Sequence, residues 1–162
     1  MGKIDLKHIN AILKLAATCV LATSAALAVA AQGNSADELL RDADRVVQQI
    51  DSNRYVDVWQ NAAPFVKVKI PRDQFVSATR QSREALGAVS RRGWASVTRL
   101  QYTAQAGIPD GLYANVDYVT TFANGRTVVE LLSFQFGEDG TWRLTGYIPR
   151  QSGETKAAHA AM

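Results

Sequence analysis

Two turn signals in the last third of the sequence constrain the fold more than any other feature. Asn124-Gly125 and Asp139-Gly140 are dipeptides typical of β-hairpin turns, and runs rich in Val, Thr, Leu and aromatic residues flank each of them. A third turn signal, Ile-Pro-Asp-Gly, occupies 108–111. The sequence therefore predicts four consecutive antiparallel strands, over residues 94–104, 112–123, 126–138 and 141–149.

The chain before residue 87 has helical periodicity instead. Ser35 begins a capping box, and an apolar stripe at spacings of three and four residues follows it. A second helical stretch is expected around Trp59 and ends at Pro64, and a third runs from Pro71 to Gly87. Helices followed by hairpins predict an α+β fold, with two to three N-terminal helices packed on a four-stranded antiparallel sheet.

Interpreted as two-residue loops, the hairpin turns fix which side chains share a face. Across Asn124-Gly125, this register places Tyr118 opposite Leu131, and it places Leu131 opposite Ile148 on the last strand. We expect the core face to hold Val116, Tyr118, Phe122, Val129, Leu131, Trp142, Leu144 and Ile148.

The other predicted face is too apolar for a simply solvated sheet surface. Sheet curvature that buries part of it is one interpretation, and an exposed binding or dimer surface is the other. The candidate binding residues on this face are Tyr113, Leu132, Phe134, Phe136 and Tyr147.

Residues 1–30 have the pattern of a signal peptide. Lys3, Lys7 and Lys14 precede an uncharged, Ala-rich run, and a small-x-small cleavage site ends at Ala30. We expect a single domain over 31–150, a flexible C-terminal tail over 151–162, and a periplasmic or secreted location. Contact with a membrane is expected only through the signal peptide before cleavage.

Removal of this segment changes the charge and the cysteine content. The formal net charge of +3 falls to +1, because three lysines and one aspartate are lost, and a nearly neutral chain argues against nucleic-acid binding. Cys19 lies in the removed segment, so the mature chain is expected to have no disulfide, thiol chemistry or cysteine metal site.

The inventory of catalytic groups in the mature chain is short. His159 is its only histidine and lies in the tail, which argues against Ser-His-Asp and Cys-His arrangements. No glycine-rich phosphate loop is present, and we expect neither a metal nor a cofactor.

Two carboxylates are the remaining catalytic candidates. The predicted register places Asp117 and Glu130 on one sheet face, where such a pair could act as acid and base. The simpler interpretation is that both are surface carboxylates, either solvated or paired with arginine side chains. Arg91 and Arg92, beside Trp94, predict either an anion contact or a solvated strand edge.

A set of residues spread along the chain carries a resemblance. It includes Trp59, the turn 109–113 (Pro-Asp-Gly-Leu-Tyr), Glu130 and the closing segment 138–147 (Glu-Asp-Gly-Thr-Trp-Arg-Leu-Thr-Gly-Tyr). Together they resemble the bacterial family called domain of unknown function 4019, over roughly residues 36–150. The resemblance implies an exported protein with no assigned activity. The element order is also similar to cystatin-like and nuclear-transport-factor-2-like folds, whose curved sheet wraps a long helix.

These observations predict a non-enzymatic envelope protein that binds an unidentified small ligand or an envelope protein, with a homodimer through the sheet as one form. One alternative is a small enzyme of the cone-shaped α+β fold, with Asp117 or Glu130 as general base on an apolar substrate. Another is a purely structural envelope component.

Overall fold

The chain folds as helices followed by a single antiparallel sheet, as the sequence predicts. The computed structural model describes residues 35–151, so the predicted signal peptide and the tail beyond Gln151 lie outside the described residues. The helices are α3 (Ala36–Asp51), α4 (Tyr55–Gln60), α5 (Pro64–Lys69) and α6 (Arg72–Glu84). The strands are β1 (Val89–Tyr102), β2 (Gly111–Phe122), β3 (Thr127–Phe136) and β4 (Trp142–Gln151). Within this range, no helix has the length and apolarity needed to cross a membrane.

Local signals explain where the helices begin. The Ser35 side chain accepts a hydrogen bond of 3.1 Å from the Glu38 N–H, which confirms the capping box. Pro64 does not end the second helical stretch. Helix α4 has already ended at Gln60, and Pro64 occupies the first turn of α5, where a missing N–H costs nothing.

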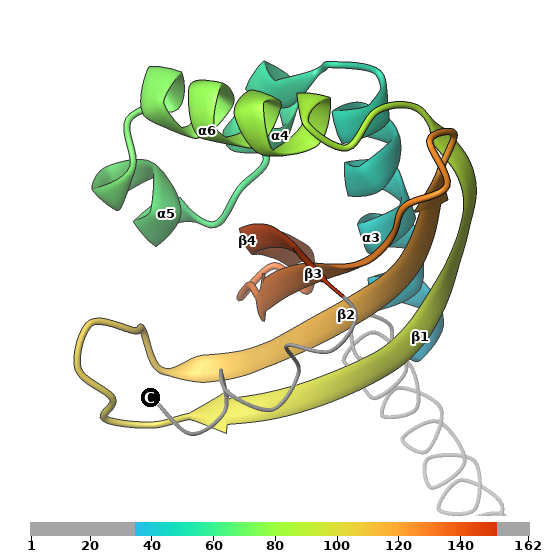
Figure 1. Ribbon diagram of the computed structural model, residues 1–162. Helices are drawn as coiled ribbons and strands as arrows, with labels where there is room; N and C mark the ends of the chain where they lie inside the picture. The colour runs from blue at the N-terminus through green and yellow to red at the C-terminus, as the bar shows by residue number, and fades with distance from the viewer. Residues whose placement is uncertain (1–34, 152–162) are drawn as a thin grey trace, which may run out of the picture.

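The strands follow one another in the order β1-β2-β3-β4, each antiparallel to its neighbour. The sheet is strongly curved, and the helices lie on its concave side (Figure 1). Strand β1 begins at Val89, five residues before the predicted start, because it pairs with β2 as far as Phe122. A register shift between Trp94 and Ser96 marks an irregularity in this edge strand.

Both tight hairpins have three-residue loops, so the predicted two-residue loops are wrong. The Phe122 N–H donates to the Arg126 carbonyl at 2.8 Å, and Gly125 in between has a φ of +81°. The Asp139-Gly140 hairpin repeats this arrangement, with Gly140 at φ +75°. A turn closed by a left-handed glycine is the common three-residue hairpin, and Asn-Gly or Asp-Gly supplies it as readily as a two-residue loop.

The extra loop residue moves β3 by one position against β2. Tyr118 pairs with Glu130 instead of Leu131, and a one-residue shift turns every side chain of a strand to the other face. The predicted faces are therefore wrong for β3. Its inner residues are Val128, Glu130, Leu132, Phe134 and Phe136, whereas Val129, Leu131 and the exposed Ile148 of β4 lie outside. A register shift at Ser133/Phe134 restores the predicted pairing of Leu131 with Ile148.

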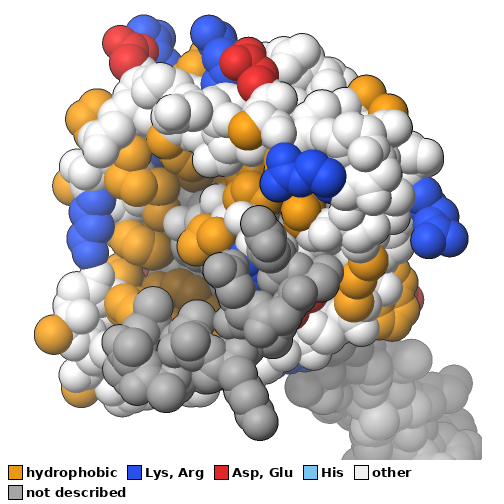
Figure 2. Space-filling model, in the orientation of Figure 1, with side chains coloured by type: hydrophobic (Ala, Val, Ile, Leu, Met, Phe, Trp, Pro, Cys, Tyr) orange, Lys and Arg blue, Asp and Glu red, His pale blue; other side chains and the backbone are white. Residues whose placement is uncertain are grey.

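The main core lies between the helices and the inner face of the sheet. It is built from Leu39, Ala43, Val47, Ile50, Tyr55, Val58, Phe75, Ala114, Val116, Tyr118, Leu132, Phe134, Trp142 and Leu144. Figure 2 shows a hollowed face between α5 and α6 on one side and strands β1 and β2 on the other, with hydrophobic side chains on its walls. Lys69 at the end of α5 donates to the Gly107 carbonyl and so ties α5 to the β1–β2 loop.

Candidate functional site

Glu130 lies at the centre of the inner face of β3 and is fully buried. Its Oε2 accepts hydrogen bonds from Arg92 Nε at 2.9 Å and from the Thr120 hydroxyl. Its Oε1 accepts a hydrogen bond of 2.6 Å from the Tyr147 hydroxyl. Both oxygens of the carboxylate therefore have donors supplied by the other three strands, which is what a buried charge requires.

Arg92 connects this carboxylate to a second one. Its Nη1 lies 2.6 Å from Oδ2 of Asp51, the last residue of α3. Arg83 of α6 reaches the same carboxylate, with Nε at 3.2 Å and Nη2 at 3.0 Å from Oδ1. Arg83 also donates to the Gly87 carbonyl. We call Asp51, Arg83, Arg92, Thr120, Glu130 and Tyr147 the charge cluster; it joins two helices to all four strands of the sheet.

The pKa values of Asp51, Arg92 and Tyr147 are shifted by the contacts within the charge cluster. Burial raises the pKa of Asp51, but the hydrogen bonds and charges of Arg92 and Arg83 outweigh it, so the pKa lies below its ordinary value. Burial lowers the pKa of Arg92, but Asp51 and Glu130 together hold it well above its ordinary value. Burial and the Glu130 charge raise the pKa of Tyr147, which therefore stays a neutral donor.

Asp117, the other predicted carboxylate, lies on the opposite face of the sheet. It accepts a hydrogen bond of 2.8 Å from Ser96 and forms an ion pair of 2.7 Å with Arg150. The predicted Asp117–Glu130 pair is therefore wrong in its geometry, because the register of β3 differs by one residue from the predicted one. The sheet itself separates the two carboxylates.

The predicted binding residues divide between the two faces. Leu132 and Phe134 are fully buried in the main core, and Tyr147 points inward to Glu130. Tyr113 does lie on the outer face, but it is covered there by the edge-on ring of Tyr102, 5.0 Å between centroids. Together with the half-buried Phe136, these side chains do not form one exposed surface, and a role in binding stays a prediction for them.

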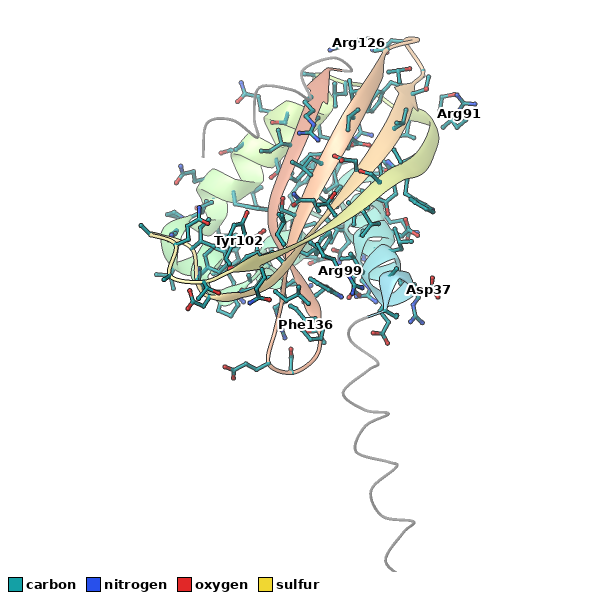
Figure 3. All side chains as sticks on the ribbon, turned by 90° about the horizontal axis from the view of Figure 1, so that it is seen from below. Asp37, Arg91, Arg99, Tyr102, Arg126 and Phe136 are labelled. Atoms are coloured by element: carbon teal, nitrogen blue, oxygen red, sulfur yellow. The ribbon has the colours of Figure 1, made fainter. Side chains whose placement is uncertain are left out.

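The two neighbouring arginines also point in opposite directions. Arg92 turns inward to the charge cluster, where both of its carboxylate partners are already bound. Arg91 is exposed and lies at the outer edge of β1, directed away from the sheet (Figure 3). An anion contact therefore stays a prediction for Arg91, whereas Arg92 already forms ion pairs with Asp51 and Glu130.

A first cavity opens where the charge cluster reaches the surface. Its volume is about 470 Å³, and it lies between the ends of α3 and α6 and the start of β1. It is lined by Ile50, Asp51, Asn53, Tyr55, Arg83, Glu84, Gly87, Ala88 and Val89. Its charged groups Asp51 and Arg83 already bind each other, so this cavity offers a ligand few free charges.

A second cavity, about 400 Å³ in volume, lies between α3, α4 and the β3–β4 hairpin. Its lining is about half polar and consists of Asp42, Arg45, Val46, Gln49, Val58, Asn61, Thr141, Trp142, Arg143 and Leu144. We call it the Trp142 pocket. The volume falls within the range of small-molecule sites, roughly 300–1,000 Å³.

Trp142 supplies the unusual feature of this pocket. The side chain is only 5% exposed and packs against Phe136, with 4.9 Å between ring centroids. Its indole N–H is buried and has no acceptor within residues 35–151. By contrast, the Trp59 indole N–H donates to the Ile70 carbonyl at 3.0 Å. A buried donor without a partner costs about 1–3 kcal/mol and is uncommon in proteins.

Several residues of these sites were not among the sequence-based candidates. Arg83 lies four residues after the buried Thr79 on the same face of α6, and a charge in that position is the signal that could have identified it. Asp51 ends α3 and gave no such signal. Trp142 is predicted in the core. That its indole N–H lacks an acceptor there can be found only from the structure.

The described residues hold no group of three or more His, Cys, Asp or Glu side chains placed to bind a metal ion. The family model described as protein of unknown function (DUF4019) matches residues 42–147. That range contains the whole charge cluster and the lining of both cavities. No curated protein matches the chain.

Proposed function

The chain belongs to the DUF4019 family of proteins of unknown function, and we propose from its own geometry that it is a non-enzymatic binding protein of the cell envelope. In this proposal the Trp142 pocket holds a small ligand. The observation that carries it is the buried, unpartnered indole N–H of Trp142, a residue that lines a cavity with both polar and apolar walls. Such a donor is satisfied when a ligand brings an acceptor.

The arrangement of the carboxylates argues against acid–base catalysis at the predicted residues. Glu130 is held by Arg92, Thr120 and Tyr147, so a substrate would have to displace a donor to reach it. Asp117 is held by Arg150 on the far side of the sheet. A general base must lie within hydrogen-bond reach of the proton it abstracts, and these contacts block that approach.

The charge cluster has a structural role in this proposal. It fastens the ends of α3 and α6 to the sheet, beside the first cavity. The middle of α3, together with α4 and the β3–β4 hairpin, then encloses the Trp142 pocket from a fixed scaffold. A rigid frame around a pocket lowers the entropic cost of binding.

The envelope location rests on the sequence of residues 1–30, with its lysines and uncharged run ending in Ala28-Val29-Ala30. Cell fractionation and the intact mass of the recovered protein test it together. A chain that begins at Ala31 in the envelope fraction is expected. A full-length chain in the cytoplasmic fraction would contradict the location.

Native mass spectrometry of the protein recovered from its own cells tests the binding function. The expected spectrum contains the chain with an added small mass, and the Trp142→Phe variant loses this added mass. Trp59→Phe is the matched control, because its indole N–H already has an acceptor in Ile70. A bare chain in wild type, recovered under gentle conditions, contradicts the pocket as a binding site.

A further inference from the structure

The Trp142 pocket presents hydrogen-bond donors in excess of acceptors. The indole N–H donates only, and two guanidinium groups, from Arg45 and Arg143, stand in the lining against the single carboxylate of Asp42. We infer that the ligand of this pocket is a small carboxylic acid with an apolar body, whose carboxylate accepts the Trp142 N–H. This inference rests on the proposed function and names the class of ligand.

The arginines keep donors available after their own ion pairs are made. Arg45 Nη1 donates to Asp42 at 2.7 Å, and Arg143 uses Nη1 and Nη2 on Asp139, which does not line the pocket. Each guanidinium has five N–H groups, so both retain free ones. Hydrogen bonds from a guanidinium to a carboxylate are stronger than those to a neutral oxygen.

The remaining walls define the rest of the ligand. Val46, Val58 and Leu144 supply apolar surface from both helices and from the sheet. A ligand made only of polar groups would leave this surface in contact with water or with polar atoms, whereas an alkyl or aryl body covers it. The pocket therefore selects a compact acid with one charged end.

Binding changes the surroundings of the indole. The Trp142 N–H is buried in this structure. In the proposed complex the indole ring turns so that this N–H meets the carboxylate. The loss of an unsatisfied donor adds to the affinity, because the free protein carries its cost and the complex does not. Removal of the donor should therefore weaken binding of an acid without harming the free protein.

Isothermal titration calorimetry with sodium hexanoate and hexanamide tests the inference on the mature protein. The two probes share the apolar chain and differ in charge, so we expect hexanoate to bind at least about ten-fold more tightly. Trp142→Phe keeps an aromatic ring but lacks the N–H, and we expect it to bind hexanoate about ten-fold more weakly.

A pair of arginine variants keeps the test independent of Trp142. Arg45→Gln removes a pocket cation, whereas Arg54→Gln removes another largely exposed arginine, which pairs with Asp57 outside the pocket. We expect hexanoate affinity to fall about three-fold in Arg45→Gln and to stay unchanged in Arg54→Gln.

Each outcome has a distinct meaning. Equal affinity for the two probes, or wild-type affinity in Trp142→Phe, overturns the carboxylate class. If neither probe binds and the native spectrum shows an added mass that is not an acid, the ligand is not a carboxylic acid, but the proposed binding function is retained. If neither probe binds and the recovered chain is bare, both fall.

Discussion

Arg92 binds two carboxylates that come from different layers of the fold. Its guanidinium lies 2.8 Å from Glu130 Oε2 in the sheet and 2.6 Å from Asp51 Oδ2 at the end of α3. The Glu130 side chain is fully buried, and the Arg92 side chain is only 12% exposed. The pair is therefore a buried ion pair, and loss of either partner would leave the other charge uncompensated.

Arg92→Met is expected to lower the free energy of unfolding by about 3–5 kcal/mol, because it leaves the Glu130 charge buried without a cation. Arg91→Met is the matched control, since Arg91 is exposed, and its effect should stay within about 0.5 kcal/mol. Urea unfolding measures both. Equal effects of the two substitutions would contradict the buried ion pair.

A double variant separates the ion pair from simple packing. Arg92→Met with Glu130→Leu removes both charges, so it should recover much of the stability that Arg92→Met loses. A double variant less stable than Arg92→Met would mean that Glu130 is needed for its contacts with Thr120 and Tyr147 instead.

Helices α3, α4 and α6 and the strand order could be predicted from sequence because their signals are local, whereas the short helix α5 is not predicted. Ser35 caps its helix through contacts three residues away, and Pro71 precedes a helix for reasons of backbone geometry alone. The turn at 108–111 and the two glycine hairpins likewise separate the strands in the order that the sequence predicts. The predicted α+β fold is confirmed on these elements.

The faces of β3 could not be predicted, because Asn124-Gly125 fits both a two-residue and a three-residue loop. The difference of one residue decides whether Glu130 faces solvent or the core. Without the correct register, the ion pair between Glu130 and Arg92, which lies 38 residues earlier in the chain, cannot be predicted. Trp142, by contrast, is predicted on the core face and lies there.

Gly125 tests the three-residue loop directly. Its φ of +81° is costly for any residue with a Cβ, although a methyl group there would meet no atom within 4 Å. Gly125→Ala should therefore destabilise the protein by about 1 kcal/mol through backbone strain alone. Gly93→Ala in β1 has equal space and no positive φ, so thermal unfolding should show no loss. Similar losses in both variants would contradict this assignment.

Phe134 tests which face of β3 is buried. It is fully buried in the main core, so Phe134→Ala should cost about 3–5 kcal/mol. Ile148 lies on the outer face with 57% of its surface exposed, and Ile148→Ala should cost less than about 1 kcal/mol. Chemical denaturation of both variants gives the ranking. The reverse ranking would restore the two-residue register.

Asp51 should make the stability depend on pH in acid. Its folded-state pKa lies below the ordinary value of 3.8, because Arg92 and Arg83 outweigh the effect of burial. A carboxylate with a lowered folded-state pKa stabilises the fold above its unfolded pKa, and this stabilisation is lost as the pH falls through the folded-state value. The free energy of unfolding should therefore fall below about pH 3.8, and less so in Asp51→Asn. Parallel pH profiles for the two proteins would contradict the prediction.

The indole region of a ¹⁵N–¹H correlation spectrum tests the central claim most directly. The chain has three tryptophans, and the cross-peak that Trp142→Phe removes belongs to Trp142. Sodium hexanoate should shift this cross-peak in a saturable manner, while the cross-peak of Trp59, whose N–H is already bound to Ile70, stays in place. A Trp142 cross-peak that does not move at any hexanoate concentration would contradict a carboxylate ligand in the Trp142 pocket.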